Sequence, residues 1–322
     1  MIPVLPPDLC MHHTVAMTDL PPAQTVQVPL APMGAAAVVT RLVDATETVA
    51  GKPVRLPPQP ELEVQEVTLA AGETLPVPPG LVQRHALVRS GALEVGTTSA
   101  RAPQRFTAGQ WVLDDGLTPW RAPGTPGAEP ARLLVVSHVQ RGRGGQGAQA
   151  LLPTALPTPS PTLLPTPSPT SLQASVRKPG GESLNESMKE SLKEPLKDPS
   201  NESSPRTSIQ PLLHTGSDYT GHPIQMPDGP LRVMVHRYEI PENATLPWHF
   251  HPYQRYAYVE RGRLQVEDRN GLRQVFQAAD VLVEQRQVVH RGTNLGQEPV
   301  VLLVFDYLPE NTRNHTTLAE PI

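Results

Sequence analysis

Two histidines, His249 and His251, are separated by one residue in a segment rich in aromatic side chains. Such a segment favours a β-strand, and side chains two positions apart on a strand point to the same face, about 7 Å apart along the chain. Neutral imidazole is the commonest transition-metal ligand among side chains, so the pair could form half of a metal site. Two histidines on a solvated strand surface are the alternative that this spacing leaves open.

Composition restricts the class of protein. A chain of 322 residues has room for about two domains, and its 40 prolines are far above ordinary usage, so part of it is expected to be unfolded. The net charge of −4 gives no sign of a nucleic-acid surface, and no apolar run is long enough to span a bilayer. The segment 1–20 lacks the basic start and apolar core of a secretory signal, and the single Cys10 excludes an intramolecular disulfide. We therefore expect a cytoplasmic protein that binds neither nucleic acid nor membrane.

The elements that would position the histidines fall into two regions of short apolar runs punctuated by Gly and Pro, a spacing typical of an all-β sandwich or barrel. Only a stretch around 35–49 carries a hint of helical period. Between the regions, the sequence of 156–162 recurs verbatim as 164–170, and such Pro-rich repeats favour an extended linker. The predicted parts are a flexible N-terminal tail (1–25), a first β-barrel (26–140), a disordered linker (141–224), a second β-barrel (225–310) and a C-terminal tail (311–322).

The second region resembles a cupin, a small β-barrel of the jelly-roll type whose metal site opens inside the barrel. His249, His251 and Gly262 match the family's first motif, and His290 and Asn294 match its second motif. The resemblance implies one divalent transition metal (Fe, Mn, Ni, Cu or Zn) held by the three histidines. His315, in the expected tail, is not counted as a ligand.

The match has departures. Arg255 stands where the family has its glutamate ligand, and a guanidinium has no lone pair to give to a metal. In one interpretation Arg255 faces the metal, with Gln254 and Tyr253 beside it, and favours an anionic substrate such as a carboxylate or enolate. In the other, Arg255 braces the structure, and Gln254 or no residue takes the fourth place. The nearby glutamates, Glu284 among them, lack ligand spacing. The Gly, Pro and Gly of the second motif are also replaced here, by Ala279, Gln285 and Gln287.

An internal duplication predicts that both barrels are cupin-like. In the first copy Arg84 persists, but Pro78, Gly80 and Trp120 stand where the second copy has its histidines, so this copy cannot bind a metal in the same way. The persistence of Arg84 favours a structural role for the arginine in both copies. The repeat has two parts, each with equal intervals in the two copies. Thr74-Leu-Pro76, Gln83-Arg84 and Gly91 match Thr245-Leu-Pro247, Gln254-Arg255 and Gly262, and Phe106-x-Ala108 to Trp120-Arg121 matches Phe276-x-Ala278 to His290-Arg291.

Two functions remain open. In the first, the resemblance implies a small-molecule metalloenzyme, dioxygenase-like or isomerase-like, whose catalytic residues are not assigned. In the second, barrel and metal recognise a small ligand without catalysis, and a storage or scaffold role is a weaker third idea. The expected partner is a small molecule, anionic in the first interpretation of Arg255. The two barrels are expected to pair within one chain, although a homodimer with pairing between chains stays open.

Overall fold

The computed structural model describes residues 25–28, 37–96, 103–125, 127–140 and 207–319. Every regular element in these residues is a β-strand, so the all-β prediction is confirmed and the hint of a helix around 35–49 is wrong. No helix among them has the length and apolar character needed to cross a membrane. The predicted N-terminal tail, apart from Thr25, and the linker up to residue 206 lie outside the described residues.

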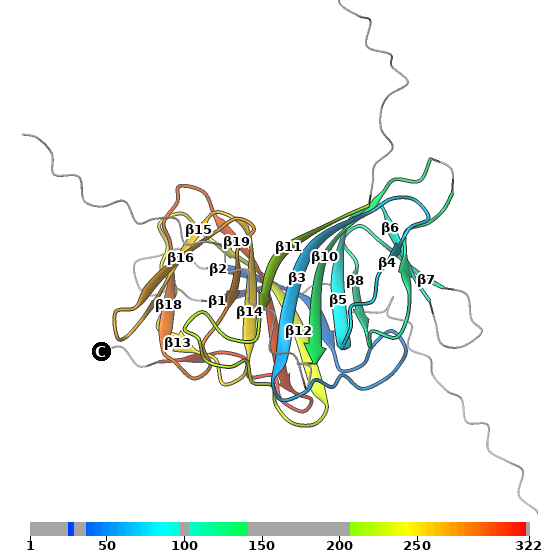
Figure 1. The fold of residues 1–322 in the computed structure, drawn as a ribbon. Helices are drawn as coiled ribbons and strands as arrows, with labels where there is room; N and C mark the ends of the chain where they lie inside the picture. The colour runs from blue at the N-terminus through cyan, green and yellow to red at the C-terminus, as the bar shows by residue number, and fades with distance from the viewer. Residues whose placement is uncertain (1–24, 29–36, 97–102, 126, 141–206, 320–322) are drawn as a thin grey trace, which may run out of the picture. The chain divides into compact units, whose positions relative to one another are not determined.

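The strands form four antiparallel sheets (Figure 1). Sheet 1 has the order β1 (Thr25–Val28), β2 (Ala37–Ala45), β12 (Leu231–Ile240), β19 (Val300–Pro309), β14 (Arg255–Arg261) and β17 (Val281–Val283). Sheet 2 has the order β11 (Ser208–Thr215), β3 (Pro60–Leu69), β10 (Ala131–Gln140), β5 (Leu81–Ser90) and β8 (Trp111–Asp114). Sheet 3 has the order β16 (Arg273–Gln277), β15 (Arg263–Asp268), β18 (His290–Asn294), β13 (His249–Phe250) and β20 (Thr317–Leu318). Sheet 4 has the order β4 (Thr74–Leu75), β9 (Trp120–Arg121), β6 (Ala92–Val95) and β7 (Gln104–Thr107).

Sheet 2 repeats sheet 1. The strands β2, β12, β19, β14 and β17 of sheet 1 correspond in turn to β11, β3, β10, β5 and β8 of sheet 2. Sheets 1 and 3 enclose one apolar core, and sheets 2 and 4 enclose another. The predicted internal duplication is therefore confirmed as two β-barrels with the same strand order.

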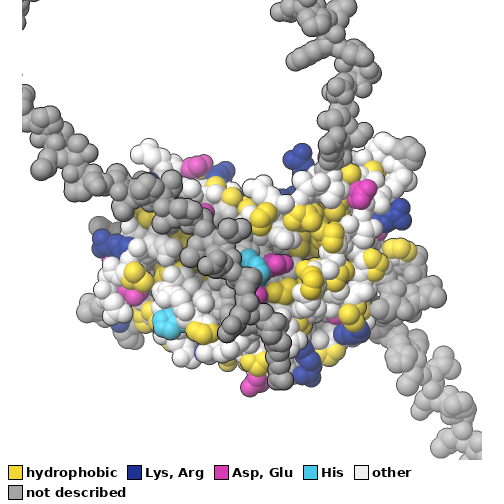
Figure 2. All heavy atoms as spheres, in the orientation of Figure 1, with side chains coloured by type: hydrophobic (Ala, Val, Ile, Leu, Met, Phe, Trp, Pro, Cys, Tyr) yellow, Lys and Arg dark blue, Asp and Glu magenta, His cyan; other side chains and the backbone are white. Residues whose placement is uncertain are grey.

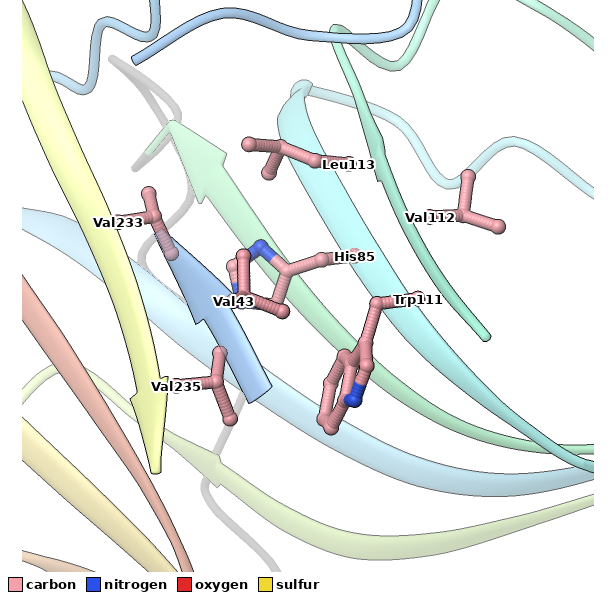
Figure 3. Close-up of a pocket in the computed structure, with 7 residues that line it drawn as sticks. All are labelled: Val43, His85, Trp111, Val112, Leu113, Val233 and Val235. Atoms are coloured by element: carbon pink, nitrogen blue, oxygen red, sulfur yellow. The ribbon is translucent and has the colours of Figure 1, made fainter. Parts of the chain in front are cut away.

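The outer faces of sheets 1 and 2 pack on each other. Along β19, Leu302 and Val304 point into the C-terminal barrel, whereas Leu303 and Phe305 belong to a third apolar cluster shared with sheet 2. A strand buried on both faces favours a continuous apolar run, which β19 shows from Val300 to Phe305. Figure 3 shows the contact, where Val43, Val233 and Val235 of sheet 1 face His85, Trp111 and Leu113 of sheet 2.

The two barrels exchange strands, with β1 and β2 in sheet 1 and β11 in sheet 2. β2 comes before β3 in the chain but pairs with β12 in sheet 1, and β11 comes before β12 but pairs with β3 in sheet 2 (Figure 1). β11 lies inside the segment predicted as linker, so folded chain resumes earlier than expected. Its Leu212 and Leu213 pack on the shared apolar cluster, which stabilises a strand in a sequence dominated by polar residues and proline.

Charges are mixed on the visible surface. On the face drawn in Figure 2, lysine and arginine side chains of the described residues lie scattered among acidic and apolar ones rather than gathered in one patch.

Candidate metal centre

Three imidazole rings meet inside the C-terminal barrel. His249 on β13 is the direct partner of His290 on β18, and His251 follows β13. The ring centroids of His249 lie 4.9 Å from His251 and 4.6 Å from His290, and those of His251 and His290 are 5.1 Å apart. One nitrogen from each ring lies within 4.8 Å of the other two, a separation that one metal ion can bridge.

Backbone carbonyls fix the orientation of all three rings. The Nδ1 atom of His249 lies 2.8 Å from the oxygen of Pro247, and that of His290 lies 2.9 Å from the oxygen of Val288. The Nδ1 atom of His251 lies 2.8 Å from the oxygen of His315. A carbonyl oxygen only accepts hydrogen bonds, so in the neutral form of each ring Nδ1 carries the proton and Nε2 keeps a lone pair. Metal-binding histidines are usually held in this way.

The burial of the rings controls their protonation. Burial lowers the pKa of His249 well below its usual value, and the neighbouring His251 and His290 lower it further. Burial also lowers the pKa of His251, with Arg255 adding to the effect. These two imidazoles are therefore neutral near pH 7, which is the form that binds metals. Burial acts in the same direction on His290, but the nearby Glu284 carboxylate outweighs it and raises its pKa.

Glu284, which lacks the ligand spacing of the family motif, lies beside two of the three rings. It follows β17, and its Oε2 lies 2.8 Å from Nε2 of His251 and 3.3 Å from Nε2 of His290. This buried oxygen has no hydrogen bond of acceptable geometry within the described part of the chain. Burial raises the pKa of Glu284, but His251 and His290 outweigh burial and hold it well below its usual range. The duplication contained a signal, because Asp114 of the first barrel occupies the matching position on β8.

Arg255 is held by a buried carboxylate. Its Nε and Nη2 donate to the two oxygens of Asp306 at 2.7 and 3.0 Å, and Asp306 lies opposite it on β19. Nη2 also lies 2.7 Å from Nδ1 of His315 and donates to Thr316 at 3.1 Å, while Nη1 lies 3.4 Å from Nε2 of His251. The structure therefore places the guanidinium beside the cluster with its charge matched by Asp306.

The two other residues suggested for substrate contact have different surroundings. The Gln254 side chain is buried, donates to the carbonyl of Glu284 at 3.0 Å and accepts from the Gln225 amide at 3.3 Å. Gln254 thus braces the backbone of Glu284. Tyr253 lies half-buried in the bend between β13 and β14 and is not among the residues that line the cavity beside the histidines.

Residues 315–318, which were expected to form a loose tail, pack against the site, and three of them line its cavity. β20 pairs with β13, with Leu318 opposite His249, and the preceding residues bring His315 and Thr316 onto Arg255. Burial, with a smaller contribution from Arg255, lowers the pKa of His315 to about 4. The expectation failed because a two-residue strand has no readable periodicity and depends on contacts distant in sequence.

A cavity of about 220 Å³ lies beside the histidines. Its polar end is formed by His249, His290, Arg255, Glu284, His315 and Thr316, and the rest of its wall is largely apolar. Gly292 lines it, and a Cβ atom at that position would lie 3.1 Å from Leu264. The absence of a side chain at Gly292 keeps this space open.

The strand register corrects the alignment of Trp120 with His290. Trp120 of the first barrel corresponds instead to Gly292, and Thr118 corresponds to His290. The buried Trp120 indole thus belongs to the apolar core of the first barrel at the position where Gly292 borders the cavity of the second. Two matched pairings set this register, Thr74 with Arg121 and Thr245 with Thr293.

The loop before His290 has a left-handed backbone at both positions where the family has glycine. Ala279 and Gln287 stand at the two glycine positions and have φ angles of 73° and 62°, in the left-handed region that favours glycine. The amide of Gln287 donates to the carbonyl of His251 at 2.8 Å, so the loop is tied directly to the histidine cluster.

The first barrel places its histidines elsewhere. His85 and His138 lie between the barrels, where His85 contacts the Tyr307 hydroxyl at 2.7 Å. The space beside His85 in Figure 3 is only about 10 Å³, roughly enough for one water molecule, and is otherwise apolar. These residues pack the contact between sheets, as ordinary strand residues do.

Comparisons with known proteins support the cupin resemblance. Residues 236–306 match the cupin domain family. A comparison with curated proteins gave no match. AerE from Microcystis aeruginosa is similar in structure, with a TM-score of 0.41, 11% identity and coverage of 89% of this chain and 98% of that chain. Oxalate decarboxylase from Lactobacillus farciminis, in a formate complex, gives a TM-score of 0.40 and 15% identity over 92% of this chain and 86% of that chain.

A third similar structure covers a shorter segment. It is a conserved protein with a double-stranded β-helix domain from Klebsiella pneumoniae, with a TM-score of 0.24 and 26% identity over 28% of this chain and 76% of that chain. All three histidines of the cluster fall within the segment that the family match covers. The C-terminal half of this chain contains a cupin domain, and the three-histidine cluster lies inside it.

Proposed function

We propose that the C-terminal barrel binds one divalent transition-metal ion through His249, His251 and His290 and acts with it on a small molecule in the adjacent cavity. The observation that carries this proposal is the convergence of three Nε2 lone pairs, each fixed by a carbonyl on the opposite ring nitrogen. When bound, an ion of this kind (Fe, Mn, Ni, Cu or Zn) supplies Lewis acidity or oxygen activation. The reaction class is then oxidative, as in a dioxygenase, or an isomerisation.

The cavity suggests the kind of substrate. Its volume of about 220 Å³ is below the roughly 300–1,000 Å³ of sites for drug-sized ligands, so the substrate is compact. Its apolar wall fits a hydrocarbon portion, and its polar end fits a polar group directed at the histidines. Arg255 and Asp306 neutralise each other, so a divalent ion beside the single negative charge of Glu284 leaves one surplus positive charge. An anionic group such as a carboxylate or enolate complements that charge.

Metal analysis of the purified protein tests the proposal. The wild-type protein is expected to contain about one equivalent of a transition metal, since one cluster is built for it. His251→Ala removes one of three ligands and is expected to lose most of the metal. His222→Ala serves as a control, because this histidine has a 66% exposed side chain and lies outside the cluster.

Unchanged metal content in His251→Ala would end the proposal. A metal-loaded protein that turns over no small carboxylic or enolic substrate, with or without dioxygen, would support the alternative of a ligand-binding cupin without catalysis.

A further inference from the structure

The two barrels of this chain contain the same arginine, and the carboxylate that each arginine binds is different. In the first barrel Arg84 lies 3.5 Å from Asp114, at the end of β8, and donates to the carbonyl of Thr118 at 2.8 Å. The indole of Trp120 lies 4.0 Å from the guanidinium and donates to Asp114 at 3.1 Å. The first barrel thus uses the carboxylate of β8 inside a closed Arg–Asp–Trp cluster.

In the second barrel a different strand provides the partner of the arginine. The residue opposite Arg84 on β10 is Ser137, whereas the residue opposite Arg255 on β19 is Asp306. Asp306 occupies the Nε and Nη2 donors of Arg255. Glu284, the counterpart of Asp114, is therefore left without a guanidinium partner in the described structure and faces the histidines instead.

The distances at Glu284 suit a shared ion. Ligands that each lie about 2.0–2.2 Å from a metal such as zinc are separated from one another by roughly 3 Å, and Oε2 of Glu284 lies 2.8 and 3.3 Å from two Nε2 atoms. The backbone of Glu284 is braced by Gln254, and its oxygen has no other hydrogen-bond partner in the described chain. Oε2 of Glu284 therefore adds an electron-pair donor beside two of the three clustered histidines, an arrangement that is complementary to a cation.

We infer that Glu284 is the fourth metal ligand of the C-terminal barrel, in place of a carboxylate at position 255, and that Asp306 keeps it available by binding Arg255. This inference rests on the proposed three-histidine site and adds to it a carboxylate from β17, a strand outside the first motif. Asp306 is a positioning residue, since it acts through Arg255.

Titration of metal-free protein with Co²⁺, followed by visible absorption, tests the assignment. Glu284→Gln is expected to weaken Co²⁺ binding by at least about tenfold, because loss of even an outer-shell partner costs about 10–100-fold. The absorption band is expected to shift as well, since a carboxylate oxygen leaves the coordination sphere. Glu260→Gln is the matched control, because this glutamate of the same barrel pairs with Arg89 and Arg237 away from the cluster.

Thermal unfolding of each metal-free variant checks that it is folded, and Glu284→Asp provides a second variant that keeps the charge but shortens the reach. Its affinity is expected to lie between those of wild type and Glu284→Gln. Wild-type affinity and spectrum in both Glu284 variants, with binding lost in His251→Ala, would overturn the role of Glu284 and leave the three-histidine site standing. A wild-type protein that takes up no Co²⁺ would overturn both proposals.

Discussion

The pair formed by Arg255 and Asp306 makes a strong prediction about stability. Both side chains are 4% exposed or less, and two hydrogen bonds of 2.7 and 3.0 Å join them. Removing one partner of such a pair leaves an uncompensated buried charge, which typically costs about 3–5 kcal/mol. Asp306→Asn is therefore expected to reduce the free energy of unfolding by about 3–5 kcal/mol. Replacing both residues, as in Arg255→Met with Asp306→Leu, is expected to be less costly than the single change, because no charge remains buried.

Urea unfolding of the metal-free proteins at neutral pH, followed by tryptophan fluorescence, measures these differences. Glu298→Gln is the control, since its pair with Arg261 is 3.9 Å long and more than half exposed on both sides. Exposed pairs contribute at most about 1 kcal/mol, so this variant should unfold almost as the wild type does. If Asp306→Asn reduced the free energy of unfolding no more than Glu298→Gln does, the conclusion that Asp306 neutralises the buried Arg255 would be refuted.

Two further predictions concern Gly262, which follows β14, and His85, which lies between the barrels. Gly262 and Gly271 have φ angles of 87° and 86°, but a Cβ atom at Gly262 would lie 2.9 Å from Val300, whereas one at Gly271 would meet nothing within 4 Å. Gly262→Ala is therefore expected to lose at least about 1 kcal/mol more unfolding free energy than Gly271→Ala, and equal losses would contradict the contact. Burial lowers the pKa of His85 to about 3, against about 6.5 when unfolded. The unfolded state then binds more protons between these values, so stability falls as the pH drops, and His85→Phe should reduce that slope by about 1.4 kcal/mol per pH unit. An unchanged slope in urea unfolding below about pH 6 would count against this assignment.

The sequence was informative where function depends on local spacing. His249 and His251 lie two residues apart, on β13 and directly after it, and the motif interval identified His290 as their companion. The β-class and the duplication could be predicted for the same reason, since alternation and repeated intervals are local properties.

The rest of the site depends on pairings between distant segments. Glu284 reaches the histidines because β17 lies beside β14, and Asp306 meets Arg255 because β19 lies on the other side of β14. His315 arrives through a two-residue strand. None of these neighbours is encoded by periodicity, which shows that a strand exists but not what it pairs with. Comparison of the two copies would have identified position 284, since Asp114 marks it in the first barrel.

The exchange of β2 and β11 between the barrels limits which parts of this chain can be removed. A fragment ending near Gln140 would retain β2 without the sheet that β2 completes, and a fragment starting near Ser208 would leave the β12 edge bare. Bare edges of this kind invite association with other chains. The N-terminal half therefore cannot be removed without loss, because its strands β1 and β2 complete a sheet of the barrel that holds the three histidines.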